Sequence, residues 1–393
     1  MISVNEARRI LSENCERGKK QTITLKDSLH FIVAEDVFSP IDVPSFNNSA
    51  MDGYAMKFDE NKHQWQVDHM IQAGDISMYK IAEGMAARIF TGAKMPEGVD
   101  TVIPQELVDY DSKSRKITYR EDKIQIGSNV RLRGSQCQKG ELILKKGTHI
   151  TPGVIGLLAS VGMAEVKVFA APSVAYIITG NELKETGTDL QEGEIYNSNG
   201  PMLEALLNNI GISNITAHKA GDDKEELQQV IDAALEQQEV LILSGGISVG
   251  DYDFVKECLE NAGVEELFYK IKQRPGKPFF AGKRGKKWIF ALPGNPSSGL
   301  SCFNHYVKPC LQFFMGAEEV WQPGKILPLT NDHKKKPGFT FFVKAKSAGN
   351  QVEVLGAQQS FNLQAFSTAN CFVELEEESE IVKAGTLVKV WDL

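Results

Sequence analysis

The pattern of hydrophobic and polar residues changes several times along the chain. Near the N-terminus Ala7, Ile10 and Leu11 recur at helical spacing, which predicts helical structure from residue 1 to about residue 30. Over residues 40–135, short runs rich in β-branched and aromatic residues are broken by Gly, Pro, Asn and Asp, a pattern typical of a small β domain. Residues 151–162 predict a short helix, because a proline stands near its start and a glycine at its end.

Predicted strands and helices alternate from about residue 172 to 318. Apolar runs at 173–178, 240–243 and 288–292 predict buried strands, and the stretches 201–210 and 224–236 predict helices between them. This alternation indicates βαβ units and a mostly parallel sheet. After about residue 320 the chain is β-patterned again, which predicts a C-terminal β domain.

Length and composition limit the class of protein. A chain of 393 residues exceeds one ordinary core and suggests roughly two to four domains. With 42% hydrophobic and 24% charged residues, the composition is that of a globular protein. The net charge of −8 disfavours a duplex nucleic-acid partner, which usually requires a basic surface. Because no apolar segment has the length of a signal peptide or a membrane helix, we expect a cytoplasmic protein that does not bind a membrane.

Cysteine and histidine give no sign of a zinc site. The six cysteines are scattered without a CxxC pair, and the seven histidines show no ligand spacing. In a long cytosolic chain this pattern predicts reduced, mostly buried thiols.

Three predicted strands end in polar, glycine-rich turns. These turns are residues 179–182 (TGNE), 244–250 (SGGISVG) and 293–298 (PGNPSS). Ligands of an open parallel sheet bind beyond the carboxyl ends of its strands. Since glycine also allows backbone N–H groups to approach an anion closely, three such turns favour a phosphate-bearing ligand over ordinary turn chemistry.

Carboxylates follow the same turns, at Glu182, Asp222, Asp223, Asp251 and Asp253. They would repel a phosphate unless a divalent cation lay between them, and Mg²⁺ is typically held by one or two carboxylates plus substrate phosphates. For Asp222 and Asp223 an N-capping role ahead of the predicted helix is an equal alternative. Only two of the five carboxylates need to bind a metal.

Two further segments attract attention. Residues 273–278 (QRPGKP) place Arg274 and Lys277 around a rigid Pro-Gly-Pro frame, which favours a fixed cationic site over a solvated turn. Residues 44–55 form a loop in which Asp52 stands beside a glycine and Tyr54. Physical reasoning alone gives that loop no function beyond a structural turn.

Taken in order, the motifs resemble those of the molybdopterin molybdenumtransferases, the MoeA and gephyrin E-domain family. The matching motifs are NNSAMDGYA (47–55), TGA (91–93), TGNEL (179–183), SGGISVGDYD (244–253), RPGKP (274–278) and LPGNPSS (292–298). The resemblance covers nearly the whole chain. It implies the transfer of molybdate into adenylyl-molybdopterin, giving molybdenum-loaded molybdopterin and AMP, with Mg²⁺ as cofactor.

The resemblance also implies a multidomain α/β fold. We expect a discontinuous N-terminal helical and linker domain at residues 1–40 and 136–170, and a β-rich domain carrying the MDGYA loop at 41–135. A three-layer, MogA-like pterin-binding domain with a mostly parallel sheet would follow at 171–318, and a C-terminal β-barrel at 319–393. The implied molecule is a homodimer whose active site combines the third domain of one subunit with the second domain of the other. Contacts with the pterin adenylyltransferase and with molybdoenzymes are also implied.

The resemblance assigns roles residue by residue. Catalytic roles fall to Asp52, Thr91, Glu182, Asp253 and Lys277. Substrate-binding roles fall to Gly245, Gly246, Ser248, Arg274, Pro293, Asn295, Pro296 and Ser297. The candidate metal ligands are Glu182, Asp253 and one of Asp222 and Asp223. Lys277 would be an oxyanion ligand for molybdate or phosphate.

Several positions depart from the family pattern. They are Asn47, Gln136, Arg274, the segment from Phe339 to Lys344, and Ala365. These changes reduce the contribution of the C-terminal domain to the anion site. They leave open a non-catalytic pterin-binding or scaffold protein of the same family. A pterin adenylyltransferase is the third hypothesis, although the extra domains and the MDGYA loop argue against it.

Overall fold

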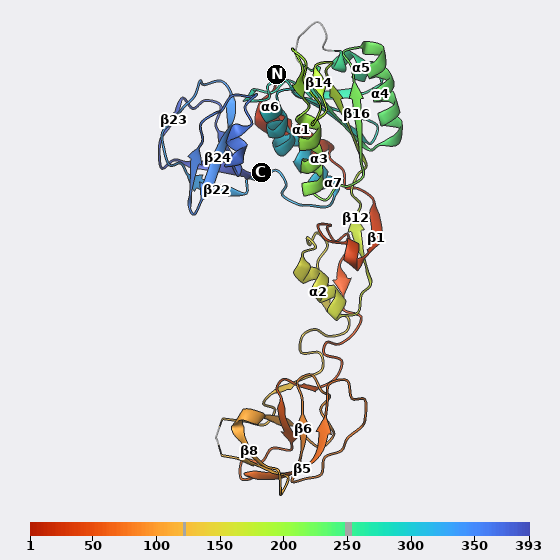
Figure 1. Cartoon of the computed structure of the whole chain (residues 1–393), viewed down its shortest axis with the longest axis vertical. Helices are drawn as coiled ribbons and strands as arrows, with labels where there is room; N and C mark the ends of the chain where they lie inside the picture. The colour runs from red at the N-terminus through yellow and green to blue at the C-terminus, as the bar shows by residue number, and fades with distance from the viewer. Residues whose placement is uncertain (121–122, 248–253) are drawn as a thin grey trace. The chain divides into compact units, whose positions relative to one another are not determined.

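The computed structural model describes residues 1–120, 123–247 and 254–393 (Figure 1). The chain forms two compact units. The first comprises Met1–Thr22, His30–Ala34 and Lys167–Leu393, and the second comprises Ile23–Leu29 and Glu35–Val166. Among the described residues, no helix has the length and apolar character needed to cross a membrane.

A six-stranded sheet forms the centre of the first unit. Its strands, in spatial order, are β16 (Ile215–Ala220), β13 (Val174–Thr179), β17 (Val240–Ser244), β21 (Lys287–Leu292), β20 (Phe280–Arg284) and β18 (Glu265–Tyr269). The first four strands are parallel, whereas β20 runs antiparallel to both of its neighbours, β21 and β18. The predicted mostly parallel sheet is therefore confirmed, with an antiparallel edge that the alternating pattern did not indicate.

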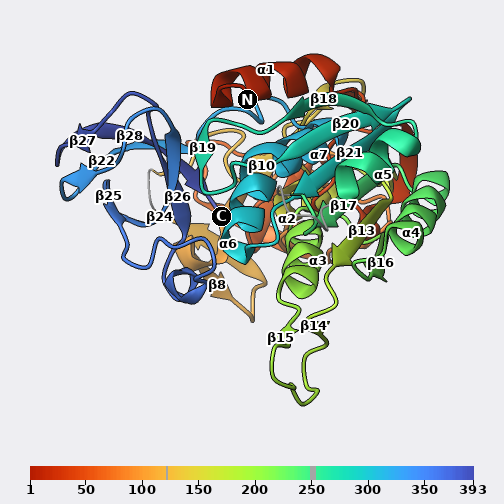
Figure 2. The ribbon, with the colours of Figure 1, turned by 90° about the horizontal axis from the view of Figure 1, so that it is seen from above.

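Helices cover both faces of this sheet. Side chains alternate along β13, so that Val174, Tyr176 and Ile178 join one buried cluster and Ala175 and Ile177 join another. The first cluster includes α1 (Val4–Asn14), α3 (Asn199–Asn209), α6 (Pro296–Cys302) and α7 (Lys308–Phe314). The second includes α4 (Lys224–Gln237) and α5 (Val255–Asn261). The predicted three-layer α/β arrangement is thus confirmed, and Figure 2 shows α4 and α5 together on one side.

The N-terminal helix is shorter than the sequence suggested. α1 ends at Asn14, and Lys20–Thr24 form the strand β1, so the prediction of helix to about residue 30 is wrong. Helix α1 begins where the Ser3 Oγ accepts a hydrogen bond from the Glu6 N–H. The helical spacing of apolar residues stops at Leu11, and β1 is mostly exposed and pairs with β12 (Glu165–Phe169).

The C-terminal part of the first unit is β structure, as expected. One sheet has the order β19 (Gln273–Arg274), β24 (Thr340–Ala348), β26 (Cys371–Leu375), β28 (Leu387–Asp392) and β22 (Lys325–Pro328), with β25 (Gln351–Val354) paired to β24. Two short strands, β23 (His333–Lys334) and β27 (Ile381–Val382), pair separately. Because β19 belongs to the QRPGKP segment, this sheet is joined directly to the α/β part, and the two lie side by side in both views (Figures 1 and 2).

The second unit contains a mixed six-stranded sheet. Its order is β7 (Thr101–Pro104), β4 (Gly53–Met56), β6 (Met85–Ile89), β5 (Gln64–Ile71), β9 (Lys116–Tyr119) and β8 (Val108–Asp111). The unit also includes β2 (Val37–Phe38), β3 (Asn48–Ser49), β10 (Val130–Arg131), β11 (Leu142–Leu144), the short helix α2 (Pro152–Ser160) and two 3₁₀ turns, Leu25–Asp27 and Gln105–Leu107. The unit is therefore β-rich, as the sequence predicted, and α2 confirms the predicted helix near residue 155.

Candidate functional site

The three glycine-rich turns meet at one edge of the α/β sheet. Strands β13, β17 and β21 are neighbours, and Ser244 at the end of β17 pairs with Ile178 on one side and Leu292 on the other. The turns approach each other closely, since a Cβ atom on Gly294 would lie 3.5 Å from the Gly245 Cα. The turns that the sequence singled out therefore come together in space.

Gly245 could not be replaced by a larger residue without movement of the turn. Its φ is +103°, and a Cβ there would lie 2.5 Å from the Thr179 Oγ1 and 2.9 Å from the Thr179 carbonyl oxygen. A glycine at this point lets the backbone of the SGG turn pass directly beside the end of β13.

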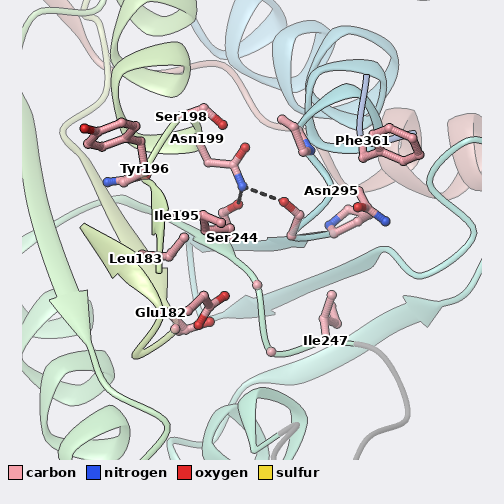
Figure 3. Close-up of a pocket in the computed structure, with 18 of the residues that line it drawn as sticks. Glu182, Leu183, Ile195, Tyr196, Ser198, Asn199, Ser244, Ile247, Asn295 and Phe361 are labelled. Atoms are coloured by element: carbon pink, nitrogen blue, oxygen red, sulfur yellow. Dashed lines mark hydrogen bonds between the residues drawn. The ribbon is translucent and has the colours of Figure 1, made fainter. Parts of the chain in front are cut away.

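The turns border a cavity of about 740 Å³ (Figure 3). Many predicted site residues line it, namely Glu182, Asp222, Gly245, Gly246, Pro293, Asn295 and Pro296. Other lining residues were not singled out from the sequence, and they include Tyr196, Asn199, Phe361 and Leu363. The cavity thus combines the predicted glycines and carboxylates with an aromatic rim.

Asn199, the first residue of α3, connects two of the turns. Its Nδ2 donates hydrogen bonds to the Ser244 Oγ at 3.0 Å and to the Gly294 carbonyl at 2.8 Å (Figure 3). The side chain is buried, so these bonds form away from water and fix the positions of the two turns relative to each other. The polar run 195–199 (IYNSN), which stands just before a predicted helix, was the sequence signal that could have identified it.

The neighbouring aspartates Asp222 and Asp223 have different roles. The Asp223 Oδ1 accepts a hydrogen bond from the Glu226 N–H at 2.8 Å and caps helix α4. Asp222 lines the cavity, and its Oδ2 accepts a hydrogen bond from the Asn181 N–H at 3.2 Å. Of the two, Asp222 is the one placed to reach a ligand.

The structure describes only some of the other predicted metal-binding and substrate-binding residues. Glu182 and Asp222 line the same cavity, whereas Asp253 and Ser248 lie outside the described residues. Within the part of the chain that the structure describes, no group of three or more His, Cys, Asp or Glu side chains gathers in a form that could hold a metal ion. The carboxylates described at this cavity could supply at most two ligands, so a metal there would need others from substrate or water.

Arg274 and Lys277 line a second cavity of about 430 Å³. The two cavities share Pro278, Pro293 and Asn295 in their walls. A recess lined by two cations therefore adjoins the larger cavity. An anion bound in this recess would lie next to a ligand bound in the larger cavity.

A buried glutamine fixes the frame that carries these cations. The Gln273 side chain is fully buried, and its Nε2 donates to the Pro275 and Gly276 carbonyls, each at 3.1 Å. The Tyr306 hydroxyl donates to the Gln273 Oε1. Burial raises the pKa of Tyr306 well above its ordinary range, so the phenol stays protonated as a donor. The Pro-Gly-Pro segment is therefore held rigid by the hydrogen bonds of the buried Gln273 side chain as well as by its prolines.

Two predicted substrate-binding residues have contacts of their own. The Arg274 guanidinium lies 5.0 Å from the centre of the Phe339 ring, a cation–π contact between two residues that depart from the family pattern. Ser297 is fully buried, lines neither cavity, and donates through its backbone N–H to the Ser360 carbonyl at 3.1 Å.

Asp52 and Thr91 lie together in the second unit. The Asp52 Oδ1 accepts hydrogen bonds from the Thr91 N–H and Oγ1–H, both at 2.7 Å. The backbone bond first, then the hydroxyl bond and the Arg88 charge, lower the pKa of Asp52, so this exposed carboxylate is ionised at neutral pH. The MDGYA loop therefore presents a fixed negative charge.

Two of the departures from the family pattern have structural partners. The Asn47 Oδ1 accepts a hydrogen bond from the Arg133 N–H at 2.8 Å, and the Gln136 Nε2 donates to the Ser160 Oγ at 3.3 Å. Ala365 is buried in a short 3₁₀ turn, Gln364–Ser367.

Sequence comparison identifies the family. The chain is 36% identical over 382 residues to the molybdopterin molybdenumtransferase of Staphylococcus aureus (strain Mu50 / ATCC 700699), an alignment that covers 94% of this chain and 90% of that protein. This chain belongs to the MoeA family. A MoeA-family relative from Staphylococcus epidermidis (strain ATCC 12228 / FDA PCI 1200), also named molybdopterin molybdenumtransferase, is 35% identical and covers 99% of this chain and 95% of its own.

Family models and solved structures agree with this assignment. The MoeA N-terminal region (domain I and II) matches residues 2–162, a probable molybdopterin binding domain matches 175–312, and the MoeA C-terminal region (domain IV) matches 327–393. The crystal structure of a molybdopterin biosynthesis MoeA protein from Pyrococcus horikoshii superposes with a TM-score of 0.81 at 30% identity, covering 100% of this chain and 99% of that one. The resemblance stated from the motifs is therefore confirmed.

Proposed function

We propose that this MoeA-family protein is a molybdopterin molybdenumtransferase. It inserts molybdate into adenylyl-molybdopterin and releases molybdenum-loaded molybdopterin and AMP. The observation that carries the proposal is the pair of adjoining cavities, one bordered by glycine-rich turns and carboxylates and the other by Arg274 and Lys277. The names of relatives that match along almost the whole chain support the same reaction.

Each cavity has a part in this reaction. The larger one holds adenylyl-molybdopterin, with its phosphates toward the backbone of Gly245 and Gly246 and the Ser244 hydroxyl. Arg274 and Lys277 hold molybdate, a tetrahedral dianion, in the adjoining recess. Adenylate is a good leaving group, so catalysis consists mainly of positioning and of stabilising charge.

We propose that a magnesium ion binds at the carboxylates of the larger cavity. Glu182 and Asp222 would supply its oxygen ligands, since Mg²⁺ is usually held by one or two carboxylates together with substrate phosphates. Asp253 is proposed as a further ligand. The ion would neutralise charge on the pyrophosphate as it is cleaved. Asp223 is left out of this set because its carboxylate caps α4.

The proposal extends to the assembly and its surroundings. In a cytoplasmic homodimer, Asp52 and Thr91 of one subunit would act at the larger cavity of the other, as the family resemblance implies. The protein would receive its substrate from the pterin adenylyltransferase and pass its product to molybdoenzymes. For the C-terminal domain we propose a closed barrel, which the bridge between Leu329 and Val352 supports, because it links the end of β22 to β25.

The deciding experiment measures AMP release from adenylyl-molybdopterin, with and without molybdate and Mg²⁺. We expect release that requires both, with molybdenum appearing in the pterin. The Lys277→Ala variant should need at least about tenfold more molybdate, because a charge-assisted contact is lost. Binding of substrate without molybdate-dependent release would favour the scaffold hypothesis. Consumption of ATP would favour the adenylyltransferase.

A further inference from the structure

One large aromatic side chain at the cavity is left open to solvent. Phe361 lines the 740 Å³ cavity and is 69% exposed, although a phenylalanine gains free energy when it is buried. It comes from the loop between β25 and the turn Gln364–Ser367, in the C-terminal part of the first unit. Tyr196, at the end of β15 (Ile195–Tyr196), is 44% exposed and lies on the opposite side of the cavity (Figure 3).

The loop that carries Phe361 is held by a buried lysine. The Lys344 side chain is buried, and its Nζ donates to the carbonyls of Ala357 at 2.8 Å, Gln359 at 3.1 Å and Asn362 at 2.8 Å. Residues on both sides of Phe361 are therefore fixed to one ammonium group. The Ser360 carbonyl is fixed as well, by the Ser297 N–H. With its backbone held in this way, the Phe361 ring cannot withdraw into the core by a movement of the loop.

Tyr196 is also held in place. Its hydroxyl donates to the Thr188 carbonyl at 2.7 Å, which fixes the direction of the ring. The cavity therefore has two aromatic side chains at its rim, Phe361 on a backbone held by Lys344 and Tyr196 held through its hydroxyl, while Glu182 and Asp222 line other parts of its wall.

We propose that Phe361 is a binding residue whose ring stacks on a fused nitrogen heterocycle of the substrate, with Tyr196 facing it across the cavity. This inference rests on the proposed function, since adenylyl-molybdopterin contains two such ring systems, a pterin and an adenine. Carboxylates and glycine turns suit phosphates and a cation, but they offer no flat apolar surface. An exposed aromatic face does, and stacking tolerates any heterocycle of suitable size.

The test measures the binding of two separate probes, AMP and free pterin, to the full chain in the presence of Mg²⁺. Phe361→Ala should weaken the binding of at least one probe by about tenfold or more, the effect of losing a stacking partner. Phe361→Leu should weaken it similarly, because bulk remains and the flat ring is lost. Phe361→Tyr should stay within about twofold of the original protein. The probe that is affected identifies which ring system stacks on Phe361.

Phe38→Ala is the matched control, since Phe38 is a phenylalanine 54% exposed in the other unit and lines none of these cavities. It should bind both probes unchanged. If Phe361→Ala binds AMP and pterin as tightly as the original protein, or if Phe361→Leu restores binding fully, stacking on Phe361 is wrong while the proposed function stands. If the unaltered protein binds neither probe, the assignment of the cavity fails, and with it the proposed function.

Discussion

Burial changes the chemistry of a single side chain most clearly at His305. This residue is fully buried in the π-helical segment Phe303–Val307, and its ring stacks on Phe342 with the ring centres 3.8 Å apart. Neither ring nitrogen has a hydrogen-bond partner among the described residues. Burial, and then the positive charges of Arg8 and Lys308, lower the pKa of His305 well below its ordinary value.

The sign of the resulting pH dependence follows from linkage. A histidine whose pKa is lowered on folding binds its proton more readily in the unfolded chain, so the free energy of unfolding falls as the pH drops below about 6.5, by up to about 1.4 kcal/mol per pH unit. We expect His305→Phe to keep the ring stack and remove this contribution. Denaturant titrations at several pH values between 5 and 8 give the free energy of unfolding of each protein. If that free energy changes with pH equally in both proteins, the prediction is wrong.

Lys344 offers a second prediction at the scale of one residue. In Lys344→Met the carbonyls of Ala357, Gln359 and Asn362 lose their common donor, and we expect the free energy of unfolding to fall by about 2 kcal/mol or more. Hydrogen exchange of the amides at 357–363 should accelerate at the same time. Lys346→Met, an exposed lysine of the same strand, is the control and should change neither quantity. Unchanged exchange in Lys344→Met would show that the loop does not depend on the lysine.

At the scale of elements, the two aspartates before helix α4 differ in role: Asp223 stabilises the helix, and Asp222 is proposed to act in the reaction. Asp223→Ala removes the N-cap and should lower the free energy of unfolding by about 1 kcal/mol without changing AMP release. Asp222→Ala should do the reverse, lowering Mg²⁺-dependent release with little loss of stability, because Asp222 faces the cavity. Thermal unfolding and the AMP assay, run on both variants, distinguish them. If the two variants lose activity equally, the division of roles is wrong.

The elements also show how far the sequence could be interpreted. Strands β13, β17 and β21 were predictable because each is a continuous apolar run ending at a polar turn. The antiparallel edge formed by β20 and β18 was not, because hydrophobic periodicity does not distinguish strand directions.

The same limit applies to the site. Its glycines and carboxylates were found, since turn chemistry is local and visible in the sequence. Phe361 was missed because it reaches the cavity from a loop more than 60 residues beyond the last glycine-rich turn. Lys344 was seen only as a departure from the family pattern, because a lysine within a strand normally indicates an exposed position, whereas this one is buried against backbone carbonyls.

At the scale of the whole molecule, the proposed site residues belong to different compact units. Asp52 and Thr91 lie in the second unit, while Glu182 and Lys277 lie in the first. The proposed homodimer requires that each active site take one set from each subunit. If the site is shared in this way, a dimer of one chain altered in the first unit and one altered in the second contains one intact site. If the site lies within one subunit, such a dimer contains none.

Mixed dimers test that consequence. At a molybdate concentration well below the one that Lys277→Ala requires, Asp52→Ala and Lys277→Ala should each be almost inactive alone, because each alters both sites of its dimer. When the two chains are co-expressed in equal amounts, half of the dimers are mixed and each mixed dimer has one intact site, so about one quarter of the original AMP release should return. Asp52→Ala paired with Thr91→Ala is the control, since both changes affect the same side of the site and no intact site can form. If the first pair stays as inactive as the control, the site lies within one subunit.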